Sequence, residues 1–356
     1  MKKLQKPNSN GNSLTTLSTA LRTYIRKVND GLLAFLDDRT PDRLYDYVRY
    51  QVGMLDENLE PVKQIKGGKR IRSAIPMLVS KYLKIDDQAI LGAISLEFFH
   101  NFTLIVDDIQ DNDEIRRGKP SLWKLIGIPQ ALNAAMIAQS LAEEAARKAC
   151  CHLPSKVAID WLESNTRLTA KVFEGQYLDI MYEKAERVFT AQYIRMAMSK
   201  TACLFGQSFA QTFSLHPKEE VRKVATQMRA VGEAAGLAFQ IQDDILGLWG
   251  DPVKTGKPVG ADIRKHKKTL PIVHALESGS RSARKLILDS FSANVTDESA
   301  QTVLECLRQT GSFEFAHTQV RDYTNKALEL LECADIYKEL KERLWGIIEY
   351  LGGRGS

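Results

Sequence analysis

Two short segments place aspartates where they could bind a divalent metal. The first, Leu-Ile-Val-Asp-Asp-Ile-Gln-Asp-Asn-Asp at 104–113, spaces Asp107 and Asp111 four residues apart. On a helix these carboxylates project from one face, one turn apart, and repel each other unless a cation lies between them. They also follow an apolar run, at a helix C-terminus, where the macrodipole disfavours negative charge. A divalent cation removes both penalties, and all-oxygen ligands favour Mg²⁺. The alternative is an acidic helix end exposed to solvent.

The second segment, Phe-Gln-Ile-Gln-Asp-Asp-Ile-Leu-Gly at 239–247, again places an aspartate pair, Asp243 and Asp244, at the end of an apolar helix. Mg²⁺ is typically held by one or two carboxylates together with substrate phosphates. Two such segments, if they face each other across the interior of a helical bundle, predict a phosphate-bearing ligand that bridges them.

The elements that carry these segments are predicted to be helices. Apolar residues recur at three- and four-residue spacing in 21–36, 91–106, 132–149, 157–180 and 221–245. Short breakers, such as 117–120 and 216–217, separate these stretches, and alternating strand patterns are absent from the sequence. We therefore expect an all-α fold, a single large helical bundle with a central cavity, over residues 14–356 after a disordered tail at 1–13.

Composition excludes several other classes of protein. The chain has 356 residues with a net charge of +5, and its basic residues are spread out rather than gathered on one stretch, unlike a typical nucleic-acid binder. No unbroken apolar run approaches the ~18 residues of a membrane span. The five cysteines are odd in number and form no Cys-x-x-Cys pair, which argues against a disulfide framework or a zinc site. We expect a cytoplasmic protein with reduced thiols.

Basic blocks around the aspartates complete a pattern that resembles the trans-type isoprenyl diphosphate synthases, the polyprenyl synthetase family, over essentially everything after the N-terminal tail. The short-chain geranylgeranyl and farnesyl diphosphate synthases are the most similar members. The blocks occur in the family's order at 67–72 (Gly-Gly-Lys-Arg-Ile-Arg), 104–118, 174–179, 200–202 and 239–271. Such an ordered set is far more specific than one Asp-Asp pair, and it implies the isoprenoid synthase type of helical bundle.

The resemblance implies a prenyltransferase that joins an allylic diphosphate to isopentenyl diphosphate. The allylic C–O bond ionises, the carbocation attacks the isopentenyl double bond, and a proton is lost. Fixed cations stabilise the departing diphosphate as it gains negative charge. By resemblance, Asp107, Asp111 and Asp243 bind Mg²⁺, three ions per site, with Mn²⁺ as an alternative, while Asp108 and Asp244 orient water or ligands. Family members are commonly homodimers.

The same resemblance assigns the basic residues to two diphosphates. Isopentenyl diphosphate would be bound by Lys69, Arg72, His100 and Arg117. The allylic diphosphate would be bound by Arg116, Lys200, Thr201, Gln240, Lys257 and Lys267. Without the resemblance, the Gly67-Gly68 segment is a turn with surface charge, since it lacks the Ser or Thr of a P-loop. A lone helical histidine such as His100 is likewise more often structural.

The second aspartate segment departs from the family pattern. Gly247 stands where a third aspartate often lies, and Asp251 follows four residues later. We hypothesise that metal binding depends chiefly on Asp243 and that the third position is supportive. Ala134-Ala135 also departs from the usual Asn-Ala-Gly-Asp stretch.

Product length is predicted from the helix that precedes Asp107. Each helical turn rises about 5.4 Å, comparable to one isoprene unit, so bulky residues one to two turns before Asp107 act as a floor for the growing tail. Thr103 and Phe102 lie about one turn before Asp107, and Phe99 and Phe98 lie near two turns. The candidate floor residues among them are Phe99, Phe102 and Thr103. Phe102 beside the small Thr103 predicts a floor of intermediate depth and mainly geranylgeranyl diphosphate, with farnesyl diphosphate as the second candidate. These phenylalanines could instead be ordinary core.

Two other functions compete with this one. A class I terpene cyclase uses similar metal chemistry on one prenyl diphosphate, but Lys69, Arg72 and Arg117 would then have no substrate to bind. A non-catalytic subunit of a heteromeric prenyl synthase tends to lose its metal aspartates, whereas the first segment here is intact.

Overall fold

The computed structural model describes residues 13–65, 67–255, 258–292 and 295–353. These residues group into two compact units, which we call the N-terminal unit (13–166 and 208–225) and the C-terminal unit (167–207 and 226–353). Helix α1 already begins at Ser13, and the rest of the predicted tail, residues 1–12, lies outside the described residues. That the chain forms one domain stays a prediction.

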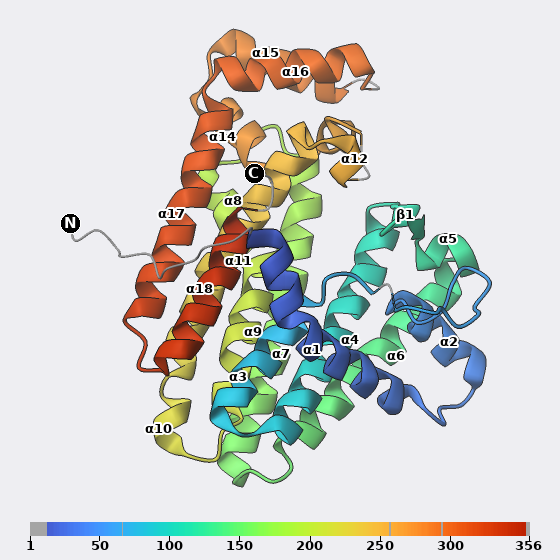
Figure 1. Cartoon of the computed structure of the whole chain (residues 1–356). Coiled ribbons are helices and arrows are strands. Elements are labelled where there is room, and N and C mark those ends of the chain that lie inside the picture. Colours follow the sequence, from blue (N-terminus) through green and yellow to red (C-terminus); the bar gives the residue numbers. More distant parts are fainter. Residues whose placement is uncertain (1–12, 66, 256–257, 293–294, 354–356) are drawn as a thin grey trace. The chain divides into compact units, whose positions relative to one another are not determined.

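Almost all regular structure is helical, which confirms the all-α prediction (Figure 1). The N-terminal unit contains α1 (Ser13–Leu36), α2 (Asp42–Gln51), α3 (Ile71–Leu83), α4 (Asp86–Gln110), β1 (Ile115–Arg116), β2 (Lys119–Pro120), α5 (Leu122–Ile126), α6 (Ile128–Cys150) and α10 (Glu219–Arg222). Helices α7 (Ser155–Glu183) and α9 (Cys203–Ser214) contribute residues to both units. The C-terminal unit contains α8 (Thr190–Ala197), the π-helix η1 (Met198–Ala202), nearly all of α11 (Ala225–Trp249), α12 (Pro252–Thr255), α13 (Ala261–Arg264), α14 (Leu270–Ser278), α15 (Arg281–Ser292), α16 (Asp297–Gln309), α17 (Ser312–Glu332) and α18 (Lys338–Gly352).

Helix α4 is the core of the N-terminal unit. It packs against α3 and, more extensively, α6. Ala134 and Ala135 of α6 are 0% and 1% exposed, and their small side chains allow the helices to approach closely, which accounts for this stretch of small residues. Among the described helices, α4 alone is long and apolar enough to cross a membrane, but 67% of that stretch is buried inside the protein. This burial is typical of a core helix.

Two details differ from the sequence prediction. The helix predicted over 221–245 is interrupted by a turn at 223–224, between α10 and α11. Arg222 bonds the carbonyl oxygens of His216 and Pro217 and holds α10 against the preceding turn. The breaker at 117–120 forms an antiparallel hairpin of β1 and β2. Its two turn residues, Arg117 (φ 57°) and Gly118 (φ 75°), both have the positive φ that suits a two-residue hairpin.

The C-terminal unit has two apolar clusters. One gathers residues of α8, α11, α14 and α17 around the fully buried Tyr193, and the other joins α13, α14, α15 and α16 at the C-terminal end of α11. Figure 1 shows α17 and α18 side by side within this unit. All five cysteines lie in the described part of the chain as free thiols, as the sequence predicted.

Candidate active site

The first aspartate segment forms the C-terminal end of α4, as the sequence predicted. Asp107 and Asp108 lie in its last turn, and Asp111 is the residue that ends it, with its N–H donating to the Asp107 carbonyl oxygen at 2.8 Å. The Arg116 guanidinium faces this helix end. Its Nε donates to Asp108 Oδ1 at 2.8 Å, and its Nη2 lies 3.5 Å from Asp107 Oδ2. Arg116 therefore offsets part of the negative charge at the helix terminus.

The first segment fits an oxygen-coordinated divalent metal. Asp108 Oδ2 is buried and has no hydrogen-bond partner in the described part of the chain. Burial raises the pKa of Asp108 to about 6, against the lowering effect of Arg116. No three His, Cys, Asp or Glu side chains among the described residues lie close enough to hold an ion by themselves. A metal here would need further oxygens from a substrate and from water, as Mg²⁺ usually has.

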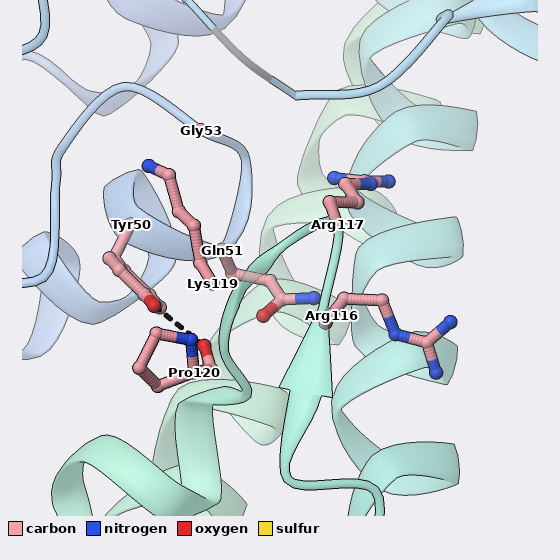
Figure 2. Close-up of a pocket in the computed structure, with 7 residues that line it drawn as sticks. All are labelled: Tyr50, Gln51, Gly53, Arg116, Arg117, Lys119 and Pro120. Atoms are coloured by element: carbon pink, nitrogen blue, oxygen red, sulfur yellow. Dashed lines mark hydrogen bonds between the residues drawn. The ribbon is translucent and has the colours of Figure 1, made fainter. Parts of the chain in front are cut away.

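The two adjacent arginines of the hairpin, Arg116 and Arg117, make different direct contacts. Figure 2 shows the two guanidinium groups apart from each other, with that of Arg117 above that of Arg116. Arg117 lies against the turn at Gly68 (φ 86°), where an added Cβ would be 3.0 Å from Arg117 Nε. A side chain at position 68 would therefore be strained by the backbone and would press on the guanidinium.

Arg70 anchors the segment that contains Lys69 and Arg72. Arg70 has a left-handed backbone (φ 47°) directly before α3, and its buried guanidinium donates to Asn29 Oδ1 at 2.8 Å and to Glu97 Oε1 at 2.5 Å. Glu97 also accepts from the hydroxyl of Ser73 at 2.7 Å. Burial raises the pKa of Glu97, but Arg70 and the other groups around it outweigh this effect and lower the pKa to about 2.

His100 lies one turn after Glu97 on α4. Burial, together with the nearby positive charges of Arg72, Arg117 and Arg116, lowers its pKa well below the ordinary value, so its imidazole is neutral at pH 7. Its Nδ1 is buried and has no hydrogen-bond partner among the described residues. The structure thus brings together Arg72, His100 and Arg117 of the predicted isopentenyl diphosphate set, while Lys69 is exposed on the same segment.

A small pocket adjoins the two arginines (Figure 2). It is lined by Tyr50, Gln51, Gly53, Arg116, Arg117, Lys119 and Pro120. The Tyr50 hydroxyl donates to the Pro120 carbonyl oxygen at 2.6 Å, which ties the end of α2 to the hairpin. Gln51 is only 6% exposed, and its Nε2 has no hydrogen-bond partner in the described chain.

In the C-terminal unit, Lys200 and Lys267, which were predicted to bind the allylic diphosphate, both form ion pairs with Asp179. Lys200 and Thr201 lie in η1, and π-helical turns are frequent at functional sites. Asp179 Oδ2 lies 2.7 Å from Lys200 Nζ and 3.1 Å from Lys267 Nζ. Although burial raises the pKa of Asp179, the two lysines lower it overall. At Gly175, an added Cβ would be 2.7 Å from the Cα of Lys200, so only glycine permits this approach of α7 to η1.

The second aspartate segment ends α11 with two carboxylates in different surroundings. Asp243 is exposed, and Asp244 is buried. Asp244 accepts hydrogen bonds from the Tyr193 hydroxyl at 2.6 Å, the Leu270 N–H at 2.9 Å and Gln240 Nε2 at 2.9 Å. Burial raises the pKa of Asp244 to about 7.

Gln240 also joins Thr201 to this network. Its Oε1 accepts from the Thr201 hydroxyl at 2.6 Å. Lys257, the remaining basic residue predicted here, lies outside the described residues.

Sequence reasoning did not assign roles to Asp179, Tyr193, Arg70 or Glu97. Asp179 and Arg70 belong to blocks that matched the family pattern, so their position was a usable signal. Tyr193 and Glu97 stand in no motif, and only the fold brings them to their partners.

The candidate floor residues lie on α4 before the first segment. Phe99 and Phe102 are 7% and 5% exposed, with ring centroids 6.0 Å apart. The Thr103 hydroxyl donates to the His100 carbonyl oxygen at 2.8 Å. Phe98 is fully buried and packs against Phe35 of α1 instead.

The chain is similar to several known proteins in sequence and in fold. The chain is 33% identical over 322 residues to a (2E,6E)-farnesyl diphosphate synthase of Mycobacterium tuberculosis, covering 89% of this chain and 88% of that one. It is 30% identical to a geranylgeranyl pyrophosphate synthase of Geoglobus acetivorans, covering 90% and 93% of the two chains. A solved geranylgeranyl pyrophosphate synthetase from Pyrococcus horikoshii superposes with a TM-score of 0.83 at 28% identity, covering 96% and 100%.

The sequence pattern of the family described as polyprenyl synthetase matches residues 55–309. This match spans both aspartate segments and all the basic blocks between them. The chain belongs to the polyprenyl synthetase family and is a prenyltransferase, a trans-type isoprenyl diphosphate synthase of the short-chain group.

Proposed function

We propose that the chain condenses isopentenyl diphosphate with an allylic diphosphate and forms mainly geranylgeranyl diphosphate, with farnesyl diphosphate as the second candidate. The observation that carries this proposal is the separation of Arg116 from Arg117. Arg116 forms its hydrogen bond with Asp108 of α4, whereas the Arg117 guanidinium lies against the turn at Gly68, in the segment that contains Lys69 and Arg72. Two adjacent cations with different direct contacts suit two diphosphates, whereas a cyclase acts on one diphosphate only.

The isopentenyl diphosphate would be held by Lys69, Arg72, His100 and Arg117. Arginine can bind two phosphate oxygens at once, and the neutral His100 can donate one N–H without adding charge. The buried pair of Arg70 and Glu97 contributes no net charge there. It therefore leaves the positive charge of the other residues available to the substrate.

The allylic diphosphate would be held by Arg116, Lys200 and Lys267, with Thr201 and Gln240 close to it and Lys257 as a further contact. In the described structure Asp179 keeps the two lysine ammonium groups near each other. A diphosphate offers more acceptor oxygens than one carboxylate, so it can draw on both lysines.

Divalent metal is part of this proposal. Asp107, Asp111 and Asp243 would bind Mg²⁺, three ions per site, and Mn²⁺ could substitute. When bound, the metal would supply positive charge to the leaving diphosphate. Asp108 and Asp244, held by Arg116 and by Tyr193, would orient water and neighbouring ligands.

Product length would be limited by Phe102 and Phe99, with Thr103 leaving room beside them. The relatives named above include both farnesyl and geranylgeranyl diphosphate synthases, so they leave the two products open. A floor of intermediate depth favours geranylgeranyl diphosphate, the longer of the two products.

A second copy of the chain is also proposed as a partner. Ile128, Leu132 and Met136 of α6 recur every four residues on one face and are 45%, 44% and 64% exposed. An apolar helix stripe of this kind suits association with another helix. We expect Leu132→Glu with Met136→Glu to convert a dimer into a monomer in light scattering. A cytoplasmic location stays a prediction.

The function is tested with purified protein, Mg²⁺, isopentenyl diphosphate and each allylic diphosphate in turn, with products identified by mass. Extension of the allylic substrate by one or more five-carbon units is expected. Cyclic hydrocarbons without incorporation of isopentenyl diphosphate would favour the cyclase. The absence of any product, together with a need for a second protein, would favour a non-catalytic subunit.

A further inference from the structure

The position of the missing third aspartate, Gly247, is covered by a carboxylate from another element. A Cβ built on Gly247 would collide with Asp262 Oδ2 and would lie 2.6 Å from its Cγ and 3.1 Å from its Oδ1. Side-chain carbons do not approach other atoms this closely. The carboxylate of Asp262 therefore occupies the volume that a side chain at position 247 would need.

The backbone around α13 holds Asp262 in this place. Gly260, directly before α13, has a φ of 72°, and its N–H donates to the Leu248 carbonyl oxygen at 2.9 Å. Ile263 is fully buried in the same apolar cluster as Leu248. Both contacts fix α13 to the C-terminal end of α11, so Asp262 is not a freely moving surface residue.

The carboxylates of Asp243 and Asp262 are spaced like those of Asp107 and Asp111 in the first segment, although they come from two helices. Asp243 and Gly247 are four residues apart on α11 and share a face, one turn apart. The Asp262 carboxylate over Gly247 therefore lies about one turn beyond Asp243. Asp107 and Asp111 have the same spacing on α4.

The other two aspartates of this stretch, Asp244 and Asp251, are less suited to act together with Asp243. The Asp244 carboxylate is buried and engaged by Tyr193, Gln240 and the Leu270 N–H. Asp251 is exposed, and its Oδ1 accepts from the Val253 N–H at 2.9 Å, at the start of α12.

We propose that Asp262 supplies the second carboxylate of the metal site at Asp243, in place of the aspartate that Gly247 lacks. This inference rests on the proposed Mg²⁺ and diphosphate chemistry of the same site. Two carboxylates on one side would leave the remaining positions to diphosphate oxygens and water, which is the arrangement Mg²⁺ prefers.

The first test measures binding of inorganic diphosphate to the full chain by calorimetry while Mg²⁺ is varied. Asp262→Asn is expected to raise the Mg²⁺ concentration needed for half-maximal binding by about tenfold or more. Asp289→Asn removes an exposed carboxylate of α15 and should leave that concentration unchanged. An unchanged value in Asp262→Asn overturns the proposal, as does a larger loss in Asp251→Asn.

The second test moves the carboxylate from α13 to α11. Asp262→Ala vacates the space over Gly247, and the double variant Gly247→Asp/Asp262→Ala places a carboxylate there from the helix itself. Mg²⁺-dependent diphosphate binding should be weak in Asp262→Ala and recover in the double variant. Equally weak binding in two variants that melt like the parent protein overturns the proposal. A parent protein that binds diphosphate with Mg²⁺ but extends no allylic substrate would refute the proposed function alone.

Discussion

Arg70 and Glu97 form an ion pair with an Nη1–Oε1 distance of 2.5 Å, and their side chains are only 1% and 2% exposed. The pair joins the segment before α3 to the middle of α4. It therefore fixes the backbone from which Lys69 and Arg72 project, without either member of the pair facing solvent. The pair therefore acts on the site by positioning Lys69 and Arg72, and not by contacting the substrate.

Removing one charge of this pair should destabilise the protein strongly. Glu97→Gln is expected to lower the free energy of unfolding by about 3–5 kcal/mol, because the Arg70 guanidinium is left buried without its counter-charge. The double variant Arg70→Met/Glu97→Leu should lose less, since no isolated charge remains. Urea denaturation measures both. A double variant that is less stable than Glu97→Gln would contradict this account.

The same carboxylate predicts a pH dependence of stability. The folded-state pKa of Glu97 is lowered from 4.5 to about 2, so its ionised form stabilises the folded state. That contribution is complete above the unfolded pKa and is lost as pH falls towards the folded one. The difference in unfolding free energy between the parent protein and Glu97→Gln should therefore shrink between about pH 4.5 and pH 2. A difference that grows in this window would refute the assignment.

Asp243 should matter far more than Asp251 for activity. Asp243→Ala is expected to lower kcat by about two to three orders of magnitude, since it removes charge stabilisation of the leaving diphosphate. Asp251→Ala removes an exposed carboxylate that bonds a backbone N–H, and should cost less than about tenfold. Steady-state rates at saturating Mg²⁺ compare the two. Equal loss in both variants would show that our ranking of these aspartates is wrong.

Shortening Phe102 should lengthen the product. Phe102→Ala removes the ring that lies beside Phe99 and deepens the space available to the growing tail by about one isoprene unit. Chromatography of the products should show a shift beyond the twenty-carbon chain. Phe98→Leu is the matched control, because Phe98 packs against Phe35 rather than Phe99. An unchanged distribution in Phe102→Ala would refute the floor.

Tyr193→Phe tests the support of Asp244. The ring and its packing remain, but Asp244 loses the 2.6 Å hydrogen bond from the hydroxyl. We expect a loss of about 1–3 kcal/mol in unfolding free energy and a higher Mg²⁺ requirement for activity. Thermal melts and Mg²⁺ titrations measure these effects. Full stability in Tyr193→Phe would mean that another donor replaces the hydroxyl.

Much of the fold was predictable because helical periodicity is strong along this chain. The end of α4 at Asp111 and the core role of α4 follow from apolar spacing and from the acidic residues that succeed it. The hairpin was not predicted, because Arg117 adopts a positive φ that no arginine signals in a sequence. The close approach of Asp262 to Gly247 could not be predicted from the sequence either, because it depends on how α13 packs against α11.

The two-residue turn of the hairpin also constrains how this chain can change. Arg116 and Arg117 are neighbours in sequence, so an insertion or deletion of one residue before the turn would shift both arginines to the wrong partners together. The loop around 115–120 should therefore tolerate substitutions at Ile115, which is 70% exposed, but not changes in length.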